Sequence, residues 1–246
     1  MHFDHEEEDR NLSLSKFESM LKTNKVLFFD SEEFEDIILH YLDLGKANLA
    51  KKALKLGLEQ HPKSTGLKLV QVEMMIYDDK LDQAEKLLNE LYAIEPTNEE
   101  IYIQKANIYS KRDKHEIAVD LLKTALEFSD DHADVYNLIG MEYLFMDNLE
   151  LAKTNFIKCL EEDFEDQSAL YNVVYCFEFL DQNKEAIEYL KTYIERNPYS
   201  EIAWHQSGRL YYGLKEYELA ATSFELATYI DEEFVGAYME RGKALE

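Results

Sequence analysis

The stretch that decides the fold is EIAWHQSGRLYYGLKEYELAATSFELATYIDEEF, residues 201–234. Large and small side chains recur in it at gaps of 4, 3, 9, 4 and 3 residues, at Trp204, Gly208, Tyr211, Ala220, Phe224 and Ala227. Gaps of three and four place side chains on one face of an α-helix, and the gap of nine leaves room for a turn. The stretch therefore predicts two short helices that are joined by a turn and pack face to face.

The same pattern recurs through most of the chain with a period of 34 residues, in units that begin at residues 31, 65, 99, 133, 167 and 201. The twentieth position of every unit is alanine: Ala50, Ala84, Ala118, Ala152, Ala186 and Ala220. The eleventh position carries a large side chain: Tyr41, Met75, Tyr109, Tyr143, Phe177 and Tyr211. An unbroken period of this length is typical of a solenoid of helical hairpins, an architecture that works by binding.

This pattern resembles the tetratricopeptide repeat (TPR) family over residues 31–246. The resemblance implies antiparallel helix pairs whose first helices line a concave surface. The expected fold class is all-α, a right-handed superhelical α-solenoid of helix-turn-helix repeats. The charged Lys68 at the fourth position makes the second unit the weakest match.

The register divides the chain into four parts. We predict a disordered acidic tail over 1–11, and an N-terminal capping helix with its linker over 12–30. Six repeats follow, at 31–64, 65–98, 99–132, 133–166, 167–200 and 201–234. Residues 235–246 form the first helix of a seventh repeat or a C-terminal capping helix. Because no second helix follows, we expect either that the native chain continues beyond residue 246 or that this end makes a protein contact.

Helix starts are also indicated by local sequence. Asp30 with Glu33 has the spacing of a capping box, and the same reasoning applied to Asp113 and Asp147 predicts that each caps the helix that follows it.

Net charge is −25, from 51 acidic and 26 basic residues, and it is spread along the repeats. An acidic surface repels phosphate, so we expect neither nucleic acid nor membrane as a partner. The charge is interpreted as serving solubility, and recruitment of a basic partner is the alternative. Without a secretory signal or a long apolar run, the expected location is cytoplasmic. Cys159 and Cys176 are expected to be reduced core residues.

The sequence contains no catalytic constellation, phosphate-binding glycine loop or metal-ligand spacing. We therefore expect no enzymatic activity, no cofactor and no metal site.

The concave positions of the first helices in repeats 3 to 6 carry amides, tyrosines and two further polar residues. Amides pair with both the N–H and the C=O of an extended backbone, and tyrosines offer an apolar face with a polar tip. The predicted protein-binding residues are Asn107, Asn137, Tyr171, Asn172, Tyr175, His205, Gln206, Arg209 and Tyr212. The alternative is that these are ordinary contacts between repeats.

The predicted function is a protein-interaction scaffold that binds a peptide or protein segment in this concave groove. The carboxylate clamp of co-chaperone TPR domains is excluded, because Asn172 matches its middle element but Ile202 and Gln206 replace its cations. One alternative function is a structural subunit of a larger assembly, with self-association through the C-terminal end. Another is an accessory module of a longer protein truncated at residue 246.

Overall fold

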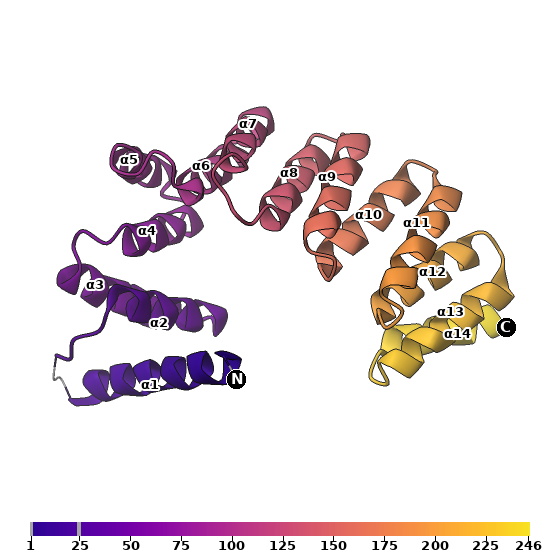
Figure 1. The fold of residues 1–246 in the computed structure, drawn as a ribbon, viewed down its shortest axis with the longest axis horizontal. Helices are drawn as coiled ribbons and strands as arrows, with labels where there is room; N and C mark the ends of the chain where they lie inside the picture. Colours follow the sequence, from indigo (N-terminus) through magenta and orange to yellow (C-terminus); the bar gives the residue numbers. More distant parts are fainter. Residues whose placement is uncertain (1, 24–25) are drawn as a thin grey trace. The chain divides into compact units, whose positions relative to one another are not determined.

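The computed structural model describes the backbone of residues 2–23 and 26–246, and side chains from residue 12 onward outside that gap. All regular elements in these residues are α-helices (Figure 1). They are α1 (His2–Thr23), α2 (Ser31–Asp43), α3 (Ala47–Gln60), α4 (Thr65–Tyr77), α5 (Leu81–Tyr92), α6 (Glu99–Ser110), α7 (His115–Ala125), α8 (Ala133–Phe145), α9 (Leu149–Glu162), α10 (Gln167–Phe179), α11 (Asn183–Arg196), α12 (Glu201–Gly213), α13 (Tyr217–Ile230) and α14 (Val235–Leu245). The prediction of an all-α repeat solenoid is confirmed.

The chain forms two compact units, Met1–Arg112 and Asp113–Glu246, which are described separately below. We call them unit 1 and unit 2. Unit 1 contains α1 to α6, and unit 2 contains α7 to α14.

In unit 1, α1 covers the first helix pair through one aromatic side chain. Phe17 is fully buried, and its ring centroid lies 6.1 Å from that of Phe29 and 6.4 Å from that of Phe34. The linker after α1 is thus anchored at Phe29, whereas Val26 and Phe28 stay exposed.

Helix α1 begins at His2, ten residues before the predicted start at residue 12. The disordered tail predicted over 1–11 therefore differs from the structure, in which residues 2–11 continue the helix; Met1 lies outside the described residues. The physical reason is local, because no Gly or Pro interrupts His2–Thr23. High charge alone was a poor argument against a helix here.

The turn inside each hairpin depends on one backbone conformation. At the fifteenth position of all six units φ is positive: Gly45, Asp79, Asp113, Asp147, Asp181 and Lys215, at 54° to 67°. This left-handed region suits Gly and is tolerated by Asp. The prediction that Asp113 and Asp147 cap helices is wrong, since the caps are Lys114 and Asn148; the capping box at Asp30 is confirmed.

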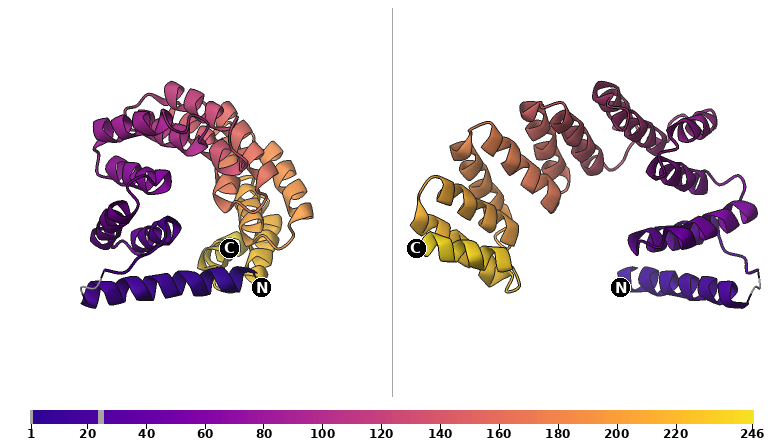
Figure 2. Two further views of the ribbon diagram at one scale, coloured as in Figure 1. Left: turned by 60° about the vertical axis from the view of Figure 1, so that its left-hand side comes forward. Right: turned by 180° about the vertical axis from the view of Figure 1, so that it is seen from behind.

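In unit 2, the helices of each close pair meet through small residues. The pairs α8/α9 and α12/α13 lie side by side in both orientations of the ribbon (Figure 2). A Cβ built on Gly140 or Gly208 would come within 2.6 Å of the ring of Phe156 or Phe224 respectively. The twentieth-position alanines of all six units are fully buried. Small side chains at these positions therefore set how closely two helices approach.

Both cysteines are buried free thiols, as predicted. Burial, together with a contact from Cys159 Sγ to Asp166 Oδ2 at 3.3 Å, raises the pKa of Cys159 to about 12. Burial raises the pKa of Cys176 to about 11. Of the helices in the described residues, none is long and apolar enough to cross a bilayer.

Candidate functional site

The candidate site in unit 2 lies on the first helices of successive repeats, α8, α10, α12 and α14. Single contacts connect these helices in series. Asn172 of α10 contacts Met141 of α8 at 3.8 Å, and the guanidinium of Arg209 on α12 lies 3.6 Å from the carboxylate of Glu178 on α10. We call the surface formed by these helices the first-helix surface.

Exposed aromatic side chains form the apolar part of this surface. Tyr171, Tyr175 and Tyr212 are 39%, 42% and 40% exposed. The ring of Tyr175 lies 4.3 Å from that of Phe179, which is 64% exposed. Rigid rings with a polar tip are the residues that most often anchor a protein partner. The three tyrosines, on α10 and α12, are therefore accessible to a partner.

The predicted amide side chains differ in their hydrogen bonding. Asn137 donates from Nδ2 to Asp166 Oδ2 at 3.2 Å, which ties α8 to the residue that caps α10. Gln206 is only 1% exposed, and its Oε1 accepts a hydrogen bond from Arg209 Nη1 at 3.0 Å. The Nε2 of Gln206 has no hydrogen-bond partner among the described residues. Asn137 thus acts within the fold, whereas Gln206 keeps a donor unused.

His205 lies in an aromatic setting between α12 and α14. Its ring centroid is 5.6 Å from that of Phe224 and 4.7 Å from that of Phe234. Burial lowers the pKa of His205, and the carboxylate of Glu240 partly offsets this. His205 Nε2 and Glu240 Oε2 are 2.7 Å apart, an ion-pair distance, so the two groups face each other.

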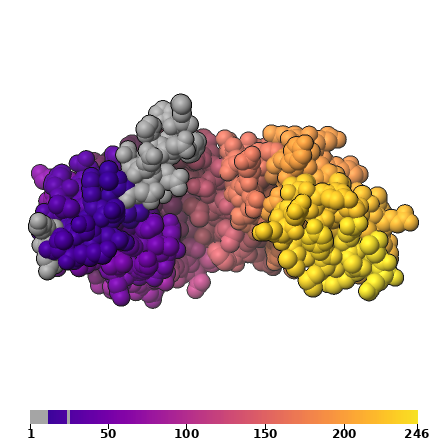
Figure 3. All heavy atoms as spheres, turned by 90° about the horizontal axis from the view of Figure 1, so that it is seen from below, coloured from indigo at the N-terminus to yellow at the C-terminus, as the bar shows by residue number. Residues whose placement is uncertain are grey.

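A cavity of about 150 Å³ opens beside this pair. It is lined by Arg209, Tyr212, Phe224, Glu240 and Lys243. Two buried side-chain atoms beside it, His205 Nδ1 and Gln206 Nε2, have no hydrogen-bond partner in the described residues. Buried polar groups are nearly always paired, so this concentration marks the place where a ligand would complete the bonding. The atoms of α14, in yellow, lie on the open face seen in Figure 3.

Eight of the nine predicted residues belong to unit 2, and Asn107 belongs to α6 of unit 1. The eight residues from Asn137 to Tyr212 lie on α8, α10 and α12 of unit 2. Glu178 and Phe179 carried no signal in the sequence pattern, whereas Glu240 and Lys243 continue the stripe of concave positions but were left out of the predicted set. Lys243 could have been found, because it stands one 34-residue period after Arg209.

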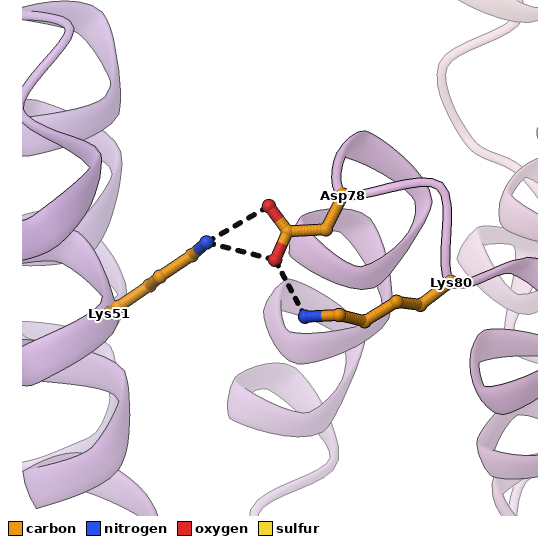
Figure 4. Close-up of polar contacts among 3 residues, drawn as sticks. All are labelled: Lys51, Asp78 and Lys80. Atoms are coloured by element: carbon orange, nitrogen blue, oxygen red, sulfur yellow. Dashed lines mark hydrogen bonds and ion pairs between the residues drawn. The ribbon is translucent and has the colours of Figure 1, made fainter.

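A second polar feature lies between the first two repeats, in unit 1. Asp78 accepts hydrogen bonds from Lys51 at 2.8 and 2.9 Å and from Lys80 at 2.8 Å (Figure 4). These two ammonium groups lower the pKa of Asp78 to about 2. The three residues lie at the edge of an open 480 Å³ groove between α3 and α4, whose floor includes Leu54 and Met74. We interpret the pairing as a bridge between adjacent repeats.

Within the described residues, no three His, Cys, Asp or Glu side chains converge as a metal site requires.

Family models described as tetratricopeptide repeat match residues 75–141, 133–166, 167–200 and 202–234. The chain belongs to the tetratricopeptide repeat family. Two of the matched segments have the bounds of the predicted fourth and fifth repeats, and a third, 202–234, begins one residue after the predicted sixth repeat. TPR modules in general mediate contacts between proteins.

The curated anaphase-promoting complex subunit 3 of Schizosaccharomyces pombe is 23% identical to this TPR chain over 159 residues, which cover 65% of the chain and 24% of that subunit. The match thus spans about a quarter of the relative's length. Among solved structures, PilW, a type IV pilus biogenesis factor, has a TM-score of 0.62 at 15% identity, covering 88% of this chain and 98% of PilW. The APC/C hetero-tetramer Cut9-Hcn1 has a TM-score of 0.60 at 14% identity, covering 98% and 47%. These structural likenesses show the fold.

Proposed function

We propose that this TPR chain is a non-enzymatic scaffold that binds a peptide or protein segment on the first-helix surface of unit 2. The observation that supports it best is the neighbourhood of exposed tyrosines and unused buried polar atoms. Tyr171, Tyr175 and Tyr212 offer apolar contact area, and Gln206 Nε2 offers an unused donor. The tyrosine rings require apolar side chains, and the unused donor requires an acceptor. An extended segment supplies apolar side chains and backbone acceptors together.

Binding would divide between two kinds of contact. Apolar side chains of the segment would pack on Tyr175 and Phe179, whose rings already contact each other. The segment's backbone carbonyls would accept hydrogen bonds from the Arg209 guanidinium, which is half-exposed. Aromatic burial would supply most of the affinity, and the polar contacts would fix the register of the segment.

The test removes aromatic surface without touching the core. Once a partner has been identified by affinity capture, its binding segment is titrated against the Tyr175→Ala, Tyr212→Ala double variant. We expect Kd to rise about tenfold or more, as for loss of interface anchors. The matched control is Tyr199→Ala with Tyr229→Ala, which removes two rings of unit 2 that are 78% and 72% exposed. Equal binding by both double variants would contradict the proposal.

A second candidate function is a structural subunit of a larger assembly. It is supported by the similarity to anaphase-promoting complex subunit 3 and to the Cut9-Hcn1 complex, both named as parts of an assembly. The C-terminal helix α14 offers a surface for it, since Val235, Met239 and Leu245 are 66%, 61% and 69% exposed. In that case the Val235→Ser, Met239→Ser double variant would lose the complex or self-association, and the tyrosine variants would keep it. The measurement is size-exclusion chromatography with light scattering.

We further propose that the protein acts in the cytoplasm and binds neither nucleic acid nor membrane. The support is the net charge of −25, which opposes contact with phosphate-bearing surfaces. A filter-binding assay with RNA and DNA, and flotation with anionic vesicles, would test this, and retention of the protein in either would contradict it.

A further inference from the structure

Two carboxylates from neighbouring first helices of unit 1 lie near each other. Glu73 is on α4 and Glu100 is on α6, and the two helices are in contact. Protein atoms around each carboxyl exclude part of its water and raise its pKa, although Glu73 keeps solvent contact. The negative charge of Glu73 raises the pKa of Glu100 further. Keeping both carboxyl groups ionised at neutral pH therefore costs free energy in the folded protein.

Neither carboxylate forms an ion pair with any residue that the structure describes. Other acidic residues of unit 1 do form ion pairs, as Asp78 does with Lys51. The nearby Lys105 is directed elsewhere, with its ammonium 4.6 Å from the ring centre of Tyr92. The charges of Glu73 and Glu100 are thus not paired with a cation of the described chain.

A buried amide beside them also lacks a bond. Gln104 is 7% exposed and donates from Nε2 to Glu100 Oε1 at 2.6 Å, so its amide group is held against that carboxylate. Its Oε1 is the only buried unpartnered side-chain atom that the structure describes in unit 1. Glu100 and Gln104 are therefore in direct contact, Glu73 lies on the helix packed against theirs, and a donor for the Gln104 oxygen is missing.

Helix capping explains only part of this arrangement. Glu100 lies in the first turn of α6, and its backbone N–H donates to the capping Asn98 Oδ1 at 3.1 Å, so its charge favours the helix dipole. Glu35 of α2 has a comparable structural role, because its carboxylate packs against Gly66 in the first turn of α4. Neither reason applies to Glu73, which lies in the middle of α4, or to the unpartnered oxygen of Gln104.

We propose that Glu73, Glu100 and Gln104 form a receptor for one cationic side chain, lysine or arginine, of a basic partner segment. An arginine guanidinium carries five donors in a plane, enough to bond carboxylates and an amide oxygen at the same time. The net charge of −25 draws basic segments to the protein over longer range, and this site then holds one residue. The site is independent of the first-helix surface of unit 2, so either proposal can fail alone.

The experiment measures binding of a fluorescein-labelled hexa-arginine peptide by fluorescence anisotropy at physiological salt, with hexa-glutamate as the opposite-charge probe. The site variant is Glu73→Gln with Glu100→Gln. The control, Glu90→Gln with Glu127→Gln, removes the same charge from exposed positions. We expect the site variant to raise Kd about tenfold or more, because charge-assisted hydrogen bonds are lost, while the control changes Kd less than about twofold. Hexa-glutamate should bind neither the parent protein nor the two double variants.

Equal weakening by the two double variants would overturn the proposal, because it would show that binding follows overall charge. Unchanged binding by the site variant, or no binding of hexa-arginine to the parent protein, would overturn it as well. The Gln104→Leu variant removes the acceptor but no charge, and we expect an intermediate loss of about threefold to tenfold. Circular dichroism establishes that each variant is folded.

Discussion

Gly208 and Phe224 occupy one space between α12 and α13, since a Cβ on Gly208 would lie 2.6 Å from the Phe224 ring. The same pairing recurs two repeats earlier, at Gly140 and Phe156. The other four units combine a larger residue at the eighth position with leucine at the twenty-fourth: Ile38 with Leu54, Val72 with Leu88, Ala106 with Leu122, and Val174 with Leu190. The two positions therefore fill a fixed volume together.

Substituting Gly208 tests this volume exchange. Gly208→Ala is expected to destabilise the protein by about 1–3 kcal/mol through overpacking against Phe224. The added Phe224→Leu substitution should recover much of that loss, since Ala106 with Leu122 is a native combination. Gly213→Ala is the control, because a Cβ there meets nothing within 4 Å. Urea unfolding measures all three, and an additive effect in the double variant would contradict the pairing.

Glu100 gives a pH-dependent prediction. Because its folded pKa is raised, the ionised carboxylate destabilises the fold, and this penalty grows as pH rises from the unfolded pKa through the folded pKa. Glu100→Gln should therefore raise Tm at pH 7, by about 1–3 °C, and the difference should vanish below the ordinary glutamate pKa of about 4.3. Glu90→Gln should shift Tm little at either pH. A lowered Tm for Glu100→Gln at pH 7 would show that the carboxylate stabilises α6 more than its burial costs.

The pKa of Asp78 is shifted in the opposite direction to that of Glu100. Lys51 and Lys80 lower its pKa to about 2, so its contribution is present above the ordinary pKa of an aspartate and is lost as pH falls from about 4 to about 2. Asp78→Asn should unfold more easily than the parent protein at pH 7 and equally at pH 2. Thermal melts across this range measure the difference, and a gap that persists at pH 2 would mean that the salt bridges are not its source.

The two thiols should be unreactive while the protein is folded. Burial raises the pKa of Cys159 to about 12 and that of Cys176 to about 11, so little thiolate forms at pH 8. Ellman's reagent should label neither thiol in buffer and both in guanidinium chloride. Fast labelling of one thiol under native conditions would place that cysteine outside the core.

The fold was predictable because it depends on a repeated pattern. Six alanines at one position indicate a close helix approach, and all six are fully buried. The turn residues were not recognised in the same way. Asp113 and Asp147 look like helix caps in sequence, yet they have positive φ one residue before the cap, because Asp suits both roles.

The candidate site was predictable only in part. Helix periodicity placed Tyr171, Tyr175 and Tyr212 on an accessible face. It could not show that Asn137 is bonded to Asp166, because a hydrogen bond between repeats depends on side-chain rotamers. It also could not show the unpartnered oxygen of Gln104, since satisfaction of a buried group is a three-dimensional property.

Site-specific photo-crosslinking to the identified partner tests the central claim most directly. Benzoylphenylalanine replaces Tyr175 or Tyr212 on the first-helix surface, or Tyr199 as the exposed control, and mass spectrometry locates the crosslinks. Our account predicts that one continuous segment of the partner crosslinks at positions 175 and 212 and not at 199. Crosslinking at 199 alone, or at none of the three positions while the complex is intact, would contradict it.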